Sequence, residues 1–238
     1  MTRSTQQHRA ARLRRFARRL HASRSGLAMV EFAFAAPLVL GMGMLGIDTA
    51  SLVIAHMQVS QIAMQTADNA SRVGTANLLS IKQVSEADIN ETLVGAEKVG
   101  ENIGIFTRGR VIISSLQRNS SGGQWIAWQR CRGAKVYNSS FGLQGAGATG
   151  TSFPGMGVTG RMITASPGTA VMFVEVAYDF QSITPMNVFN NQQIVYTAAY
   201  NVRDNRDLTG GPTSNGLFQT SPVTPAANCT TYSAARPA

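Results

Sequence analysis

The sequence predicts an α+β protein in which a long N-terminal membrane helix continues into a stem and is followed by a small antiparallel β-sheet domain. Three observations support this fold class. An apolar run follows a cluster of arginines near the N-terminus, and small residues then recur at helical spacing. Four runs with strand-like alternation lie between residues 110 and 203. The 238 residues suffice for one ordinary domain and an appendage.

Residues 1–26 form a basic segment that we expect to be a leader peptide. They contain 8 of the 21 lysines and arginines, and no acidic residue precedes Glu31. From Leu27 onward, 13 basic residues face 12 acidic ones, so the remaining net charge is only +1. A basic flank directly before an apolar run is typical of the cytoplasmic side of a membrane helix. We therefore expect membrane lipid as a partner, and no nucleic acid.

Residues 27–55 are the expected membrane span. No charge occurs from Phe32 to Ile47, and extension across Asp48 gives a helix long enough for a hydrocarbon core of about 30 Å. A buried core helix is the alternative, but such helices rarely follow a cluster of arginines. We expect a single-pass inner-membrane protein with a cytoplasmic N-terminus and a periplasmic C-terminal domain.

A distinctive string surrounds the start of this span. It runs Arg-Ser-Gly-Leu-Ala-Met-Val-Glu-Phe-Ala from Arg24 to Ala33 and continues through apolar residues to Pro37. The string resembles the processing site of type IV pilins and pseudopilins. The match is closest to the TadE/TadG-like proteins of tight-adherence (Flp-type) pili, and it covers about 45 residues.

The resemblance implies a minor pseudopilin of a pilus assembly machine, whose partners are a prepilin peptidase, other pilins or pseudopilins, and inner-membrane platform proteins. The peptidase would cut between Gly26 and Leu27, and Glu31 would pair with the new amine of a neighbouring subunit. Phe32 departs from members that carry tyrosine there. Other members keep the membrane segment without cleavage, so an uncleaved anchor stays open.

The chemistry of these residues fits that role. Cleavage would leave a cationic amine on Leu27 and an anionic Glu31 in apolar surroundings, and each would lower the desolvation cost of the other. Alternatively, Glu31 extends its carboxylate to the membrane interface.

Residues 56–104 are the expected helical stem. A stripe of small residues continues the helix from Leu27 to about Leu79, with a break near Gly74. The stripe consists of Val59, Ile62, Ala63, Thr66, Ala67, Ala70 and Val73. It would pack against the globular part or against other subunits. A second helix is expected over 87–103.

Residues 105–209 are the expected β domain. A hairpin of 110–118 and 124–131 precedes a second pair of strands, 170–180 and 193–203. The helix-then-sheet order is also what the pilin resemblance implies. The glycine-rich loop 132–168 is long enough to be functional or mobile, and we expect the tail 210–238 to be extended.

Cys131 and Cys229 both follow the membrane span, where an even number of cysteines favours one disulfide. The bond would close a loop of roughly 100 residues, which is worth about 4 to 5 kcal/mol by chain entropy. Two unpaired thiols are the alternative.

We expect no enzymatic activity, cofactor or metal. Three segments fit G-x-G-x-x-G, but none has the strand and helix that a phosphate cradle requires. The three histidines, His8, His21 and His56, precede the expected sheet. Glu175 and Asp179 would share a strand face, for which the ordinary interpretation is exposure to solvent.

Two alternatives to the pseudopilin remain. An uncleaved, signal-anchored envelope protein could bind a surface or glycan through the glycine-rich loop and two tryptophans. An exported enzyme is suggested by Arg14-Arg15-Phe16, which resembles a twin-arginine signal, but further arginines follow where apolar residues are expected.

Overall fold

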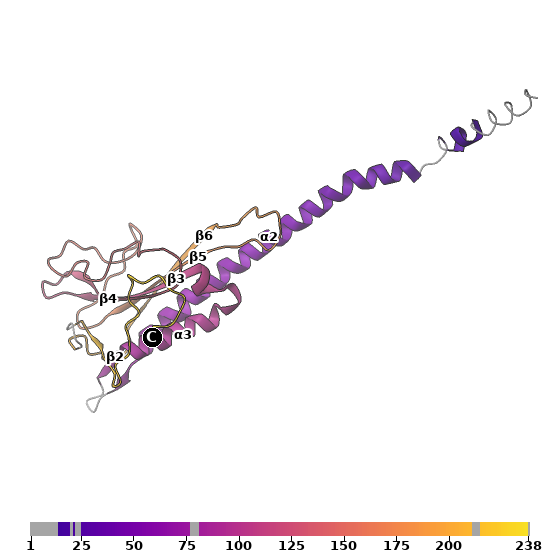
Figure 1. Ribbon diagram of the computed structural model, residues 1–238. Coiled ribbons are helices and arrows are strands. Elements are labelled where there is room, and N and C mark those ends of the chain that lie inside the picture. Colours follow the sequence, from indigo (N-terminus) through magenta and orange to yellow (C-terminus); the bar gives the residue numbers. More distant parts are fainter. Residues whose placement is uncertain (1–13, 20, 22–24, 77–80, 211–214, 238) are drawn as a thin grey trace, which may run out of the picture.

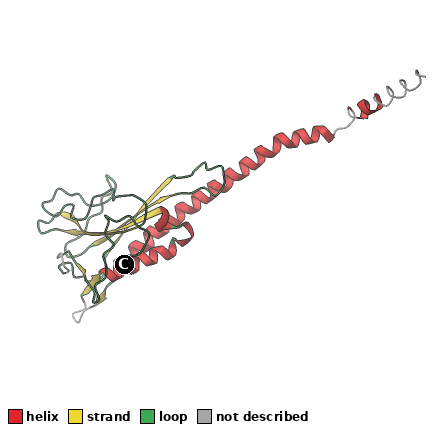
Figure 2. Ribbon diagram, in the orientation of Figure 1, coloured by secondary structure: helices red, strands yellow, loops and turns green. Residues whose placement is uncertain are grey.

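One long helix projects from a domain that combines a sheet with short helices (Figures 1 and 2). The computed structural model describes residues 1–238 except 1–13, 20, 22–24, 77–80, 211–214 and 238. In chain order the elements are α2 (Ser25–Arg72), β1 (Thr75–Ala76), β2 (Lys82–Ser85), α3 (Glu86–Val99), η1 (Glu101–Ile103), α4 (Ile105–Arg108), β3 (Gly109–Arg118), β4 (Gln124–Arg132), β5 (Val171–Asp179), β6 (Gln193–Asn201) and β7 (Leu217–Phe218). The predicted α+β class is confirmed.

The main sheet contains the four predicted strands in the order β4-β3-β5-β6, with every neighbouring pair antiparallel. Residues 119–123 form the turn that joins β3 to β4, the two strands of the predicted hairpin. There Asn119 closes the turn through two hydrogen bonds to Gly123. Its side-chain Oδ1 accepts from the backbone amide of Gly123 at 2.9 Å, and its backbone amide donates to the carbonyl oxygen of Gly123, also at 2.9 Å. This hairpin places Trp125 and Trp128 on β4.

α2 and α3 cover one face of the sheet and form the main core with it. The predicted small-residue stripe is buried, from Val59 to Ala70. Small side chains let the helix lie close to the apolar residues of β5 and β6. The sequence left two packing partners open for the stripe, the globular part and other subunits. In the structure the stripe packs against the globular domain. The strand residues of this core include Met172, Val174, Val176, Tyr178 and Ile194.

The opposite face of the sheet is also buried, and the glycine-rich loop covers it. Phe141 and Phe153 of the loop pack against a second apolar cluster that includes Phe173 of β5. Phe141 and Phe173 meet edge to face, with ring centroids 5.0 Å apart. The long loop is therefore a packed layer of the domain.

The stem helix does not continue to about Leu79: α2 ends at Arg72, at the break that the sequence predicted near Gly74. Gly74 has φ +124°, and a Cβ atom there would lie 2.9 Å from the carbonyl oxygen of Gln83. The position therefore requires glycine, and the chain turns back at this point. The second predicted helix appears as α3 and η1, and the capping box of Ser85 and Asp88 fixes the start of α3.

The C-terminal tail contributes one short strand. β7 pairs in parallel with β2 and completes a small sheet in the order β1-β2-β7. The described part of the tail otherwise runs as loops over the domain (Figure 1).

Candidate functional site: an apolar helix and a tethered domain

The N-terminal half of α2 is an exposed apolar rod. Within the described residues, α2 is the one helix long and apolar enough to cross a membrane. Residues 26–47 measure about 33 Å at 1.5 Å per residue, close to the thickness of a hydrocarbon core. Their large apolar side chains point outward; they include Leu27, Met29, Phe32, Phe34, Leu38, Leu40, Met42 and Ile47. This segment can serve as a single-pass membrane anchor.

The residues predicted for processing and assembly lie at the beginning of this rod. Gly26 and Leu27 occupy the first turn of α2, and Leu27 is 61% exposed. Glu31 and Phe32 follow one turn later, and both side chains are exposed. Arg24, the last residue of the basic cluster, lies outside the described residues. Cleavage at Gly26 and assembly through Glu31 stay predictions.

The same rod offers small-residue surfaces to a neighbouring helix. Among the residues that the structure describes, nothing lies within 4 Å of a Cβ atom placed at Gly41, Gly43 or Gly46. Close approach of a second helix at such positions is a common mode of packing in membranes.

The rod ends at Asp48, a residue whose role the sequence did not reveal. Asp48 is the first buried residue of α2, and its side chain is 0% exposed. Its Oδ1 accepts from the backbone amides of Ile183 and Thr184 at 3.1 and 3.0 Å, and its Oδ2 accepts from the Thr184 hydroxyl at 2.6 Å. These bonds fix the loop between β5 and β6 to the helix (Figure 1).

At the other end of the stem, Arg206 caps α2. Its guanidinium donates to the carbonyl oxygens of Ala70, Ser71 and Val73, at 2.8 Å for Val73. These carbonyls have no partner within the helix, and a cation at a helix C-terminus is stabilising. Burial lowers the pKa of Arg206 to about 10, which leaves it cationic at neutral pH. Asp48 and Arg206 thus mark the two ends of the helix segment that the domain holds.

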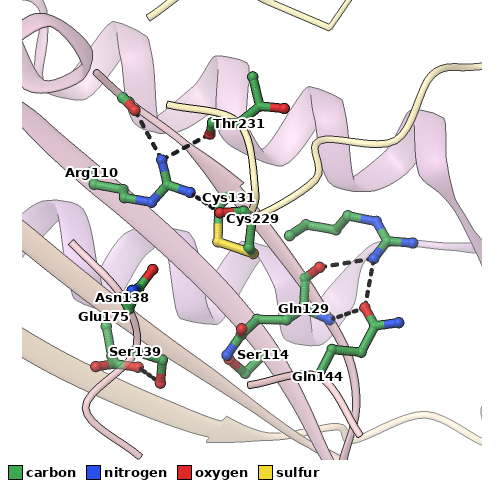
Figure 3. Close-up of a disulfide and its surroundings, with 12 residues drawn as sticks. Arg110, Ser114, Gln129, Cys131, Asn138, Ser139, Gln144, Glu175, Cys229 and Thr231 are labelled. Carbon is green, nitrogen blue, oxygen red and sulfur yellow. Dashed lines mark hydrogen bonds between the residues drawn. A yellow bond between two sulfur atoms is a disulfide. The ribbon is translucent and has the colours of Figure 1, made fainter. Parts of the chain in front are cut away.

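The predicted disulfide between Cys131 and Cys229 is present and ties the tail to β4 (Figure 3). Beside it, Arg110 of β3 is 0% exposed, and its guanidinium donates to the carbonyl oxygens of Gly133, Thr231 and Cys229 at 3.0, 3.0 and 2.6 Å. One covalent bond and a buried cation therefore hold the same stretch of tail.

Ion pairs connect β4 to α3 and to the tail. Arg130 donates through two nitrogens to the Glu86 carboxylate, and both side chains are nearly buried. Arg132 pairs in the same way with Glu97 at 2.9 Å, and Arg236 of the tail reaches Glu97 at 3.1 Å. The hydrogen bond from Arg132 is the main cause that holds the pKa of Glu97 below its ordinary value. Bidentate pairs of this kind fix relative orientation.

The expectation that Glu175 and Asp179 lie on a solvent-exposed strand face is wrong for Glu175, which is 0% exposed. The glycine-rich loop covers it: Ser139 donates through its hydroxyl, and Ser140 donates through its amide at 3.0 Å. Burial raises the pKa of Glu175. Asp179 is partly exposed and pairs with Lys135 at 2.6 Å. The two carboxylates have separate partners and make no catalytic pair.

Within the part of the chain that the structure describes, no group of three His, Cys, Asp or Glu side chains is arranged to hold a metal ion. His56 lies on α2 and contacts the hydroxyl of Tyr196 at 3.4 Å. The predicted G-x-G-x-x-G segments at 145–150 and 155–160 lie in turns of the glycine-rich loop.

Comparison with known proteins locates a family signature on this helix. A family model described as TadE-like protein matches residues 26–74, which are α2 without its first residue and the two residues after it. The resemblance predicted from the sequence is confirmed over this segment. No curated protein and no solved structure matches the chain.

Proposed function

We propose that this chain, whose residues 26–74 match the TadE-like family, is a structural pseudopilin of a tight-adherence pilus machine. One observation carries the proposal: the family match falls on a helix whose N-terminal half is exposed and apolar, while its C-terminal half is buried in a domain of its own. Such a helix can anchor the domain and contact other helices at once. The proposed role requires no catalysis.

The charge distribution and the disulfide support one orientation. The arginines before Gly26 favour a cytoplasmic N-terminus under the positive-inside rule. The opposite end of the helix then leads into the periplasm, where disulfides form and persist. The Cys131–Cys229 bond lies in the domain that this orientation exports. We therefore assign the domain to the periplasmic side of the inner membrane.

Within this role, Gly26 and Leu27 flank the bond cut by a prepilin peptidase, and Glu31 directs assembly. Glu31 is the one charged residue between Gly26 and Ile47, and it lies on an apolar surface. An unpaired carboxylate in hydrocarbon is costly, so a partner cation would stabilise it. The amine that cleavage creates on Leu27 of a neighbouring subunit supplies that cation.

The first test is the N-terminal sequence of the protein recovered from membranes of cells with and without the peptidase. A start at Leu27 only in the presence of the peptidase supports the proposal. A start at Met1 or Thr2 in both removes processing, and cleavage beyond Ala50 replaces the anchor by an ordinary signal peptide.

The second test separates anchoring from assembly. Glu31→Ala should insert normally but abolish pili, whereas Phe32→Tyr, which restores the residue of other cleaved members, should assemble normally. Normal pili with Glu31→Ala would remove the assembly role of this carboxylate.

The uncleaved binding protein is less well supported by the geometry. Trp128 is 2% exposed in the main core, and Trp125 packs against the same core, so neither forms an open aromatic platform. The glycine-rich loop likewise packs its apolar side chains against the sheet.

A further inference from the structure

The loop between β5 and β6, residues 180–192, extends farther along α2 toward its N-terminus than the rest of the domain (Figure 1). It is fixed there by the bonds that Ile183 and Thr184 make to Asp48. Because residues 26–47 match the thickness of a hydrocarbon core, Asp48 lies at the depth where the helix leaves the membrane. The loop has the same depth, since it is bonded to this residue.

The composition of the loop suits a membrane surface. Residues 180–192 include no charged side chain. Three apolar side chains point outward: Ile183 is 72% exposed, Met186 is 47% exposed and Val188 is 50% exposed. Exposed apolar groups gathered on one loop usually mark a contact surface. The remaining residues are mainly asparagine, glutamine, serine and threonine, which hydrogen-bond readily to headgroups and interfacial water.

The loop is anchored well enough to hold such a contact. Phe189 packs against the main core, and the Phe180 amide and carbonyl bond to Gln192 and Asn191 at 2.9 and 2.7 Å. The inward residues therefore fix the loop, while the side chains of Ile183, Met186 and Val188 stay exposed in the part of the chain that the structure describes.

From depth, composition and anchoring together, we propose that the β5–β6 loop inserts Ile183, Met186 and Val188 into the outer interface of the same bilayer that α2 crosses. The domain then has two membrane contacts, which fix how it is oriented on the membrane. This inference rests on the proposed membrane anchor. Since the loop is uncharged, the contact needs no anionic lipid.

The test adds one tryptophan at a time to the full chain, which keeps its two native tryptophans. Each variant is reconstituted in phosphatidylcholine vesicles with or without brominated acyl chains, which quench nearby indoles. The variants are Val188→Trp and Met186→Trp in the loop, Val39→Trp in the helix, and Val158→Trp on the glycine-rich loop as a matched exposed control. The unaltered protein gives the background of its two native tryptophans, and an unchanged urea unfolding midpoint confirms that each variant is folded.

We expect brominated lipid to quench most of the added emission at positions 39, 186 and 188, and none at 158. If brominated lipid quenches the tryptophan at position 39 but not those at positions 186, 188 and 158, the loop contact is overturned and the membrane anchor stands. No quenching at 39 overturns both. A blue shift at 188 without quenching, which grows with the protein-to-lipid ratio, assigns the surface to a second copy of the chain and also overturns the proposal.

Discussion

Removal of the disulfide should lower the free energy of unfolding by an amount that the loop length determines. Cys131 and Cys229 are 98 residues apart. The chain-entropy relation gives about 4.7 kcal/mol at 25 °C for a loop of this size. The tail stays bound through other contacts, such as those of Arg110, so the folded state should persist. With a urea m value of about 2 kcal/mol/M, the unfolding midpoint should fall by about 2 M.

The assay is urea unfolding of the full chain in detergent, followed by tryptophan fluorescence. Both tryptophans lie on β4, the strand that carries Cys131, so the signal reports on the tethered sheet. The Cys131→Ala/Cys229→Ala double variant should match the unaltered protein under reductant, because both lack only the cross-link. A fall of the midpoint by less than about 0.5 M in both would refute the loop-entropy reasoning. A fall in the double variant alone would assign the loss to packing of the sulfur atoms.

Three further predictions concern single residues. Asp48→Ala should weaken the anchoring of the β5–β6 loop by about 1 to 3 kcal/mol, because it leaves buried amide donors unpaired. Asp48→Asn should cost less. Equal rates of hydrogen exchange at the Thr184 amide in the two variants would contradict this prediction. Gly147→Ala should destabilise by about 2 to 5 kcal/mol, since φ is +77° and a Cβ would collide with Phe153. Gly145 has φ +90°, but the space around its Cα is open, so Gly145→Ala should lose only the free energy of backbone strain, about 1 to 2 kcal/mol. Identical melting temperatures of the Gly145→Ala and Gly147→Ala variants would argue against the collision. Glu175 has a raised pKa, so the folded state keeps its proton to higher pH than the unfolded chain does, and stability should fall as pH rises above 4.5. Glu175→Gln should lack this fall, and parallel pH profiles of the two unfolding midpoints would exclude the effect.

The elements of the fold follow from local patterns in the sequence. Alternation along β5 and β6 correctly identified the face that packs on the helix, from Met172 to Tyr178. The stripe from Val59 to Ala70 identified the buried side of α2. These patterns work because strand and helix periodicities are set by backbone geometry.

Features that depend on distant partners could not be predicted in the same way. Asp48 is paired with Thr184, 136 positions away, and nothing in its local sequence points to that residue. Burial of Glu175 depends on Ser139, which lies in a glycine-rich segment without periodicity. Alternation in β5 signalled one buried face, whereas the second face is covered by phenylalanines that are widely spaced in the loop.

The candidate site could be predicted from the sequence where it consists of a local motif. Gly26 and Glu31 lie five residues apart in one string, and the family match includes both residues. The two cysteines were paired by parity and by their position beyond the apolar run. The end of the exposed rod at Asp48 was visible only in the structure, since the apolar composition continues past it.

The position of α2 on the sheet has a mechanical consequence. α2 packs lengthwise on β5 and β6, with Asp48 at one end of the contact and Arg206 at the other. A pulling force applied through the N-terminal rod would act along this interface, so its contacts would have to shear together and could not peel apart one by one. The disulfide lies on β4, at the opposite edge of the sheet. We therefore expect reduction of the disulfide to lower resistance to urea while leaving the force needed to extract the helix nearly unchanged.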